Sequence, residues 1–125
     1  MSNPNKIKGD AFERSVQDYL QANGFPWTEK TRAGYARDHG DLHLVPGPAV
    51  IAQAKNVRAW RLPEWVDELA EQIVDAKADH GVLVVKRPRV ADPGRSYAVM
   101  ELSALVRLLR EAGYGEQWPD RMVAS

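Results

Sequence analysis

The stretch from Asp41 to Asn56, DLHLVPGPAVIAQAKN, carries the pattern that decides the fold. Apolar and polar side chains alternate on either side of a Pro-Gly-Pro turn at residues 46–48. This alternation predicts two antiparallel strands, residues 41–45 and 49–56, which a short connection joins as a hairpin. The hairpin therefore has one apolar face, suited to burial, and one polar face.

The register of this hairpin brings polar residues together. If Val45 pairs with Ala49, Asp41 lies directly opposite Gln53, and Lys55 falls on the same face because side chains alternate along a strand. A slip of one residue would separate these side chains. The opposite face of the hairpin is apolar and consists of Leu42, Leu44, Val50, Ala52 and Ala54.

The rest of the chain predicts helices and strands on both sides of the hairpin. Apolar spacings of three and four residues predict helices, short apolar runs predict strands, and glycines and prolines mark the turns. The predicted helices span residues 6–23, 62–79 and 102–112, and the further strands span 27–31, 81–85 and 97–100. The order α-β-β-β-α-β-β-α predicts an α/β domain with a mixed central sheet flanked by helices, because a helix between two strands favours their parallel pairing.

The first predicted helix places one acidic residue beside the core. Phe12, Val16 and Leu20 recur on one stripe of this helix. Glu13 lies on the flank of that stripe, about 75° from its centre. We therefore expect Glu13 to reach into a cleft next to the buried side of the helix.

Length and composition limit the classes of protein that this chain fits. Its 125 residues, 44% of them hydrophobic and 27% charged, predict one folded domain over 1–125, with a loosely packed tail from about residue 114. The lack of cysteine excludes disulfide frameworks and thiolate metal sites. No apolar run approaches the roughly 20 residues of a membrane span, and residues 1–6 do not resemble a signal peptide. We therefore expect a cytoplasmic protein that does not bind membranes.

The chain has no net charge, but its charges are segregated along the sequence. Residues 63–80 carry one basic and six acidic side chains, whereas residues 81–110 carry six basic and two acidic ones. This segregation fits a folded surface with a basic side that binds nucleic acid. It equally fits the solvated acidic face of one helix, so composition leaves both interpretations open.

The polar residues of the hairpin and of the first helix form a chemically useful set. Asp41, Gln53 and Glu13 offer oxygen ligands to a hard cation such as Mg²⁺, and Lys55 adds an ammonium group. A cation held in this way lowers the pKa of an attacking water and shields phosphate charge, while the lysine stabilises developing negative charge. This set predicts phosphodiester hydrolysis.

The same residues resemble a known nuclease signature. Gly40-Asp41 followed by Gln53-Ala54-Lys55 resembles the PD-(D/E)xK motif, and the segment KGDAFER at residues 8–14 resembles the Lys-Gly-x-x-x-Glu-Arg start of archaeal and viral Holliday-junction resolvases. The resemblance implies a restriction-endonuclease-like fold, with Glu13, Asp41 and Gln53 as metal ligands and Lys55 as the catalytic lysine. It also implies a homodimer that cuts branched, four-way DNA, one strand per subunit, with Mg²⁺ as cofactor and Mn²⁺ as a substitute.

The sequence departs from the nuclease signature at two positions. Gly40 stands in place of the proline, and Gln53 stands in place of the second acidic residue. An amide ligates a cation through its carbonyl oxygen but brings no charge. The site therefore has one anion fewer, and we expect it to bind its metal more weakly.

Basic and aromatic residues near this site are expected to hold DNA. Contacts of this kind to phosphates give affinity without reading the base sequence. The residues expected on this surface are Lys8, Arg32, Tyr35, Arg37, Arg58 and Arg61. Each of them, taken alone, also fits an ordinary solvated position. Trp60 fits either a packed edge residue or a stacking contact, and we expect packing.

Other interpretations of the same residues stay open. Asp41 also fits a residue that only starts a strand, and Gln53 and Lys55 fit the wet face of an edge strand. His39, Asp41 and His43 alternate as zinc ligands do, although a zinc site normally needs further ligands. The functional alternatives are another nuclease of the same fold, such as a nickase or exonuclease, and a DNA-binding module that has lost catalysis.

Overall fold

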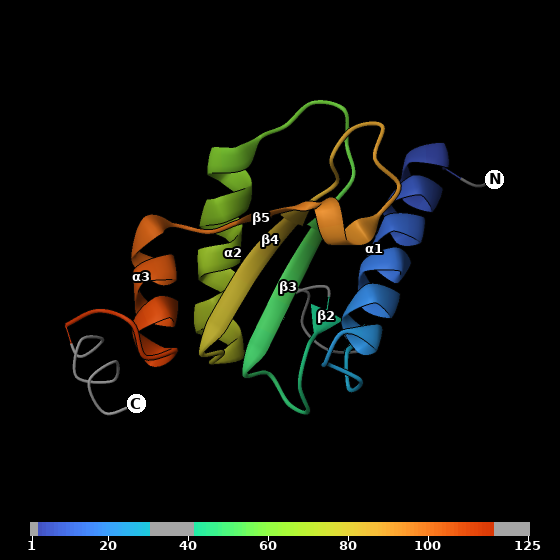
Figure 1. The fold of residues 1–125 in the computed structure, drawn as a ribbon. Helices are drawn as coiled ribbons and strands as arrows, with labels where there is room; N and C mark the ends of the chain where they lie inside the picture. The colour runs from blue at the N-terminus through green and yellow to red at the C-terminus, as the bar shows by residue number, and fades with distance from the viewer. Residues whose placement is uncertain (1–2, 31–41, 117–125) are drawn as a thin grey trace.

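The computed structural model describes residues 3–30 and 42–116 (Figure 1). Its elements are α1 (Pro4–Ala22), β1 (Glu29–Lys30), β2 (Leu42–His43), β3 (Val50–Lys55), α2 (Leu62–Ala76), β4 (His80–Val85), the 3₁₀ helix η2 (Pro93–Arg95), β5 (Tyr97–Val99) and α3 (Leu102–Glu111). Apart from η2, which lies between the predicted strands 81–85 and 97–100, this is the predicted order of helices and strands.

The five strands form one mixed sheet in the order β1-β2-β3-β4-β5. β3 and β4 pair in parallel, and the other neighbours pair antiparallel. The parallel ladder runs from Val50 opposite His80 to Lys55 opposite Val85, and α2 makes the crossover that a parallel pair requires. The predicted α/β class with a mixed, helix-flanked sheet is confirmed.

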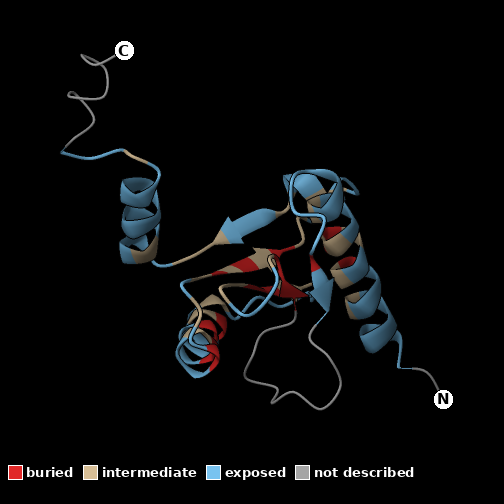
Figure 2. Ribbon diagram, turned by 90° about the horizontal axis from the view of Figure 1, so that it is seen from below, coloured by how far each residue is buried: buried red, intermediate tan, exposed pale blue. Residues whose placement is uncertain are grey.

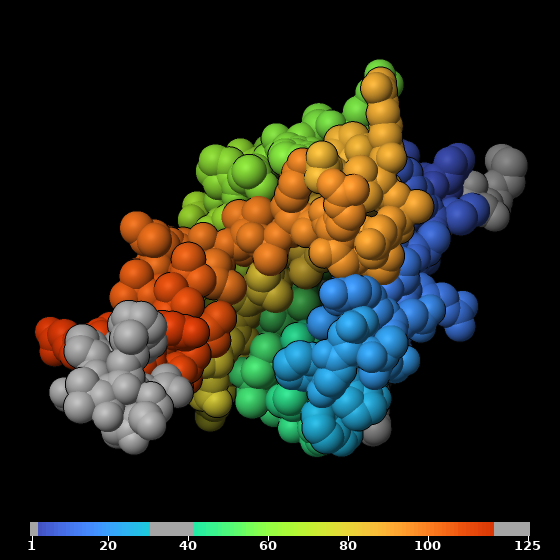
Figure 3. Space-filling model, viewed as in Figure 1, coloured from blue at the N-terminus to red at the C-terminus, as the bar shows by residue number. Residues whose placement is uncertain are grey.

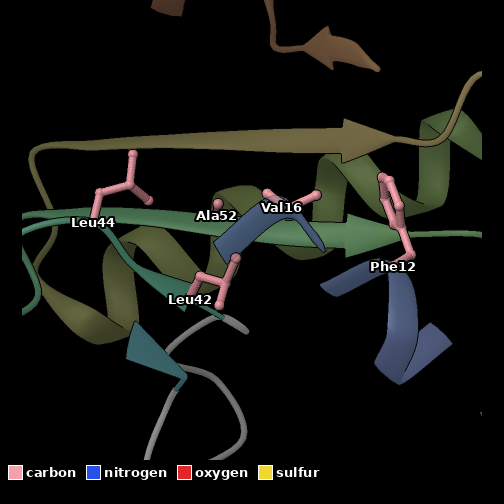
Figure 4. Packing of buried hydrophobic residues seen from close by; sticks show 5 residues of the cluster. All are labelled: Phe12, Val16, Leu42, Leu44 and Ala52. Atoms are coloured by element: carbon pink, nitrogen blue, oxygen red, sulfur yellow. The ribbon is translucent and has the colours of Figure 1, made fainter. Parts of the chain in front are cut away.

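Helices α1 and α2 cover opposite faces of the sheet, since the side chains of β3 alternate between two hydrophobic clusters. Ala52 of β3 packs with α1 residues Phe12 and Val16 (Figure 4), and its neighbour Ile51 packs with Trp65 of α2. The α1 cluster comprises Phe12, Val16, Leu42, Leu44 and Ala52, and the α2 cluster comprises Ile51, Trp65, Leu69, Leu83 and Val85. Figure 2 shows that burial is concentrated on these two helices and the strands between them.

The hairpin has the predicted register. Leu42 lies opposite Ala52, and His43 lies opposite Ile51. The predicted apolar face is also the face that packs against α1, where Leu42 and Ala52 are fully buried. The register and the apolar face are therefore confirmed for the described part of the hairpin.

Two helix ends differ from the prediction by two residues or more. α1 begins at Pro4, two residues early, because the Asn3 side chain caps it by accepting a hydrogen bond from the N–H of Asn5 at 2.9 Å. α2 ends at Ala76, before the predicted residue 79, because Lys77 adopts a left-handed conformation with φ of 55°. A left-handed residue at this position ends a helix and turns the chain towards the next element, here β4.

The C-terminal part of the chain is the least buried. α3 lies at the β5 end of the sheet, far from α1 (Figures 1 and 2), and none of its residues is buried. Of the predicted tail, Tyr114 is 51% exposed, and residues 117–125 lie outside the described residues. In residues 3–30 and 42–116, no helix combines the length and the apolar content of a membrane span.

Candidate active site

Gln53 and Lys55 share one face of β3, on the side of the sheet that α2 covers. Ile51 on the same face belongs to the α2 cluster, and Nζ of Lys55 lies 5.6 Å from the ring centroid of Trp65. An ammonium over an indole ring is an attractive contact of about 0.5–1 kcal/mol at exposed sites. Trp65 is only 7% exposed, so the contact fixes Lys55 against a part of the core.

The carbonyl oxygen of Gln53 is an available ligand. The side chain is 7% exposed, and its Oε1 atom has no hydrogen-bond partner among the described residues. A buried polar atom without a partner costs about 1–3 kcal/mol, which favours binding of a group that satisfies it. Hard cations take neutral carbonyl oxygens as well as carboxylates. Gln53 therefore fits the predicted role of a metal ligand.

Asp41, predicted as an anionic ligand together with Glu13, lies outside the described residues, as does His39. The described pairing of Leu42 with Ala52 ends one residue before Asp41. If this register continues by one residue, Asp41 lies opposite Gln53 and on the same face. The joint site of Asp41, Gln53 and Lys55 thus stays a prediction, and the described register agrees with it.

Glu13 lies on the other side of the sheet. It sits on α1 next to Phe12, and its carboxylate binds Nζ of Lys30 at 3.3 Å. Lys30 is opposite Leu42 in the sheet and so shares the α1 side with it. The structure therefore brings Glu13 together with Lys30, and it does not bring Glu13 together with Gln53 and Lys55. The helical stripe correctly predicted the position of Glu13 beside the core but did not reveal which face of the sheet α1 covers.

The predicted DNA-binding residues fall into three groups. Lys8 and Arg58 line cavities at the C-terminal ends of β3 and β4. Arg61 precedes α2, and its Nε atom binds the carboxylate of Glu64 at 2.6 Å, which partly neutralises its charge. Arg32, Tyr35 and Arg37 lie outside the described residues. Of this set, Lys8 and Arg58 therefore lie at a cavity, and the DNA-binding role of all six residues stays a prediction.

Two further buried polar residues lie on the same side of the sheet as Gln53. His43 is 5% exposed and shares a face with Ile51, whereas Gln72 projects from α2 and its Oε1 atom has no hydrogen-bond partner within the described part of the chain. Gln72 was missed by the sequence analysis, although it stands three residues after Leu69 on the buried stripe of α2. The described ranges contain no cluster of three His, Cys, Asp or Glu side chains that could hold a metal. A metal site at β3 would therefore need a ligand from outside the described residues, and Asp41 is the predicted one.

Comparison with known proteins agrees with this arrangement of sheet, helices and Gln-x-Lys strand. The model of a restriction endonuclease family, Mrr_cat, matches residues 4–112, which include both Gln53 and Lys55. The arrangement is that of a PD-(D/E)xK nuclease with a restriction-endonuclease-like fold. Within that superfamily, the chain belongs to the Mrr_cat restriction endonuclease family. Searches of curated proteins and of solved structures gave no match.

Proposed function

We propose that this nuclease resolves four-way DNA junctions by phosphodiester hydrolysis with Mg²⁺, for which Mn²⁺ substitutes. The observation that carries the hydrolytic part is the buried Gln53 carbonyl, without a hydrogen-bond partner in the described residues, on the same strand face as Lys55. The preference for branched DNA rests on the likeness of residues 8–14 to the start of the junction resolvases. Both parts can be tested separately.

The roles of the three side chains follow from their chemistry. Asp41 supplies the negative charge that a divalent cation requires, and Gln53 adds a neutral oxygen. A divalent cation held by these residues would shield the phosphate charge and lower the pKa of the attacking water. Lys55 donates hydrogen bonds to that water or to a phosphate oxygen and stabilises the negative charge that develops as the P–O bond to the leaving sugar breaks. Trp65 keeps the ammonium of Lys55 in place through the ring contact.

The position of Glu13 favours a structural role over metal binding. Its ion pair with Lys30 ties α1 to strand β1 on the side of the sheet away from Lys55. A ligand role, which the resemblance implies, would require its carboxylate to leave Lys30 and pass the edge of the sheet. The catalytic proposal therefore rests on Asp41, Gln53 and Lys55.

A homodimer fits symmetric cutting, because two cuts related by a two-fold axis require two active sites. Helix α3 offers a surface for this contact. Its apolar side chains are open to solvent, with Leu102 75% and Val106 48% exposed, while Arg107 donates to the carbonyl of Asp79 in the same domain. We expect a dimer in solution by light scattering, and we expect Val106→Lys to produce a folded monomer. A wild-type protein that is monomeric at all concentrations would remove this part of the proposal.

The substrate is tested by comparing a synthetic four-way junction with a linear duplex of the same sequence. Paired, symmetric nicks on the junction and little cutting of the duplex are the expected result. Equal digestion of both substrates would instead favour the nickase or exonuclease. Binding without cutting, in Mg²⁺ and in Mn²⁺, would favour a module that has lost catalysis.

A further inference from the structure

Two cavities adjoin each other at the C-terminal ends of β3 and β4. Their volumes are about 500 Å³ and about 450 Å³, and both are lined by Lys8, Asn56, Lys86 and Arg89. Because these lining residues are shared, the two cavities form one continuous depression, here called the basic trough. Figure 3 shows the chain after β4, in orange, standing beside the N-terminal half of α1, in blue, where this trough lies.

The basic trough carries uncompensated positive charge. Arg58 joins Lys8, Lys86 and Arg89 in its wall, and no acidic side chain lines it within the described residues. On α1, the nearby Lys6 and Asp10 pair with each other at 3.0 Å, a hydrogen bond that lowers the pKa of Asp10. No ion pair of the four lining cations occurs in the described part of the chain. The trough is therefore suited to bind an anion.

Lys86 also holds the shape of the trough. Its Nζ atom donates to the carbonyl of Val90 at 3.0 Å and to that of Arg87 at 3.4 Å. Carbonyl oxygens satisfy the ammonium but carry no net charge, so the positive charge of Lys86 is retained. The same contacts close the turn that presents Arg89.

Arg89 occupies a backbone conformation that an arginine does not favour. Its φ is 64°, and the turn around it is closed by a hydrogen bond from the N–H of Val90 to the carbonyl of Arg87 at 3.3 Å. The left-handed region costs a residue with a Cβ roughly 1–2 kcal/mol, and turns that need it usually take glycine or asparagine. Strain of this kind is typical of positions where the side chain serves a function. Here the side chain is a cation in the wall of the trough.

The basic trough begins directly beside the candidate active site. Asn56 follows Lys55 in the chain, and the N–H of Lys86 donates to the carbonyl of Lys55 at 3.0 Å. An aromatic residue, Trp60, lines the same trough, is 40% exposed, and packs edge-on against Tyr97 with 5.8 Å between ring centroids. A row of cations with an aromatic side chain is the usual lining of a path for a nucleic acid strand. Trp60 thus packs against Tyr97, as expected, and still exposes part of its ring to solvent.

We propose that the basic trough binds the sugar-phosphate backbone of DNA next to the phosphate that is cut, with Lys8, Arg58 and Arg89 contacting phosphates. This inference rests on the proposed nuclease function and adds the path of the substrate to it. Lys86 holds the turn, and Trp60 contacts a sugar or base of the same strand. The favourable energy comes from the release of counterions, so the affinity falls with salt.

The test compares two single substitutions to asparagine, one inside the trough and one outside it. Arg89→Asn and Lys77→Asn each remove one positive charge, and each places an asparagine where a basic residue now has positive φ. Lys77 caps the far end of α2 and does not line the trough. Asparagine suits the left-handed region, so neither variant is expected to lower the melting temperature.

The readout is the affinity for a fluorescein-labelled four-way junction, measured by anisotropy in EDTA over a range of KCl concentrations. Loss of one phosphate contact is expected to weaken binding by Arg89→Asn about five- to tenfold at 0.1 M salt and to reduce the log–log salt slope by about 0.9. Arg89→Lys retains the slope, and Lys77→Asn binds as wild type. Equal affinities of Arg89→Asn and Lys77→Asn would overturn the proposal.

Two further arms separate this proposal from the proposed function. Arg58→Ala removes a cation from a different wall of the trough, in the connection between β3 and α2, and is expected to weaken DNA binding as Arg89→Asn does. If both variants bind DNA with wild-type affinity, the trough does not bind DNA. Binding in EDTA does not depend on hydrolysis, so a wild-type protein that binds through the trough but never cuts DNA contradicts only the catalytic proposal. If the wild-type protein cuts DNA but the trough variants bind DNA as tightly as wild type, only the proposed DNA path is contradicted.

Discussion

Leu42 lies directly opposite Ala52 in the antiparallel pair of β2 and β3. This pairing decides which side chains of the two strands share a face, because side chains alternate along each strand. It directs Leu42 and Ala52 towards α1 and leaves Gln53 and Lys55 on the side of α2. Continued by one residue, it also sets Asp41 opposite Gln53. The proposed chemistry depends on this register.

Substitutions of Lys55, or of the Trp65 ring that contacts it, should lower the rate of hydrolysis without changing the affinity for DNA. We expect Lys55→Ala to reduce single-turnover cleavage by about 100-fold or more, the typical loss on removal of one group that stabilises transition-state charge. Trp65→Leu, which removes the ring under the ammonium, should slow cleavage about two- to fivefold, and Trp65→Phe should slow it less. Wild-type cleavage by folded Lys55→Ala would contradict the assigned role.

Gln53 should limit the affinity for the metal. In Gln53→Glu a second negative charge faces the cation, so we expect half-maximal cleavage at a lower Mg²⁺ concentration than in wild type. Gln53→Ala removes the oxygen and should require more Mg²⁺. Titration of cleavage against Mg²⁺, with melting temperatures as a check on folding, measures both effects. If all three proteins have the same Mg²⁺ dependence, Gln53 does not ligate the metal.

Substitution of Glu13 distinguishes the observed ion pair with Lys30 from the metal-ligand role that the resemblance implies. Because Glu13 binds Lys30 on the α1 side, Glu13→Gln should lower the free energy of unfolding by less than about 1 kcal/mol. It should leave the Mg²⁺ dependence of cleavage unchanged. Urea unfolding and the same Mg²⁺ titration measure these quantities. A strong loss of cleavage with unchanged stability would return Glu13 to the ligand set.

Gly81 provides a test of the packing between α2 and β4. A Cβ atom at this position would lie 2.7 Å from both Cγ1 and Cδ1 of Ile73, so Gly81→Ala should destabilise the protein by about 1–3 kcal/mol. Gly9 in α1 has no atom within 4 Å of the corresponding position, and Gly9→Ala should stabilise the protein by up to about 1 kcal/mol. Urea unfolding checks both values.

The clash between a Cβ atom at position 81 and the Ile73 side chain is tested with a double variant. Adding Ile73→Val to Gly81→Ala should restore part of the stability, and full additivity of the two changes would contradict this clash.

The features that the sequence predicted are those encoded within one element or one hairpin. Alternation along the hairpin predicted the register and the apolar face, and helical spacing predicted the buried stripe of α1 and the presence of α2. The face of the sheet that each helix covers depends on the connections and on tertiary packing, and for this reason the pairing of Glu13 with Lys30 was not foreseen. The left-handed backbone of Lys77 and Arg89 was also missed, because local preference for that conformation points to glycine and asparagine.

The basic trough is a similar case. Its cations come from α1, from the chain between β3 and α2, and from the turn after β4, so that no single stretch of sequence contains the pattern. Only the parallel pairing of β3 and β4 brings the ends of both strands, and the residues that follow them, to the same edge. Lys8 and Arg58 were predicted as DNA contacts, and the sequence did not predict that Lys86 and Arg89 lie beside them.

The most direct test of the catalytic proposal is the rate at which wild type and Asp41→Asn cut a synthetic four-way junction in Mg²⁺. The register predicts that Asp41 supplies negative charge to the metal beside Gln53 and Lys55 rather than a contact to DNA, so the variant should retain its affinity for the junction in EDTA. Its cleavage should fall by about 10²- to 10³-fold, and EDTA should abolish cleavage by wild type. Cleavage by folded Asp41→Asn at the wild-type rate, or wild-type cleavage that persists in EDTA, would contradict the assignment.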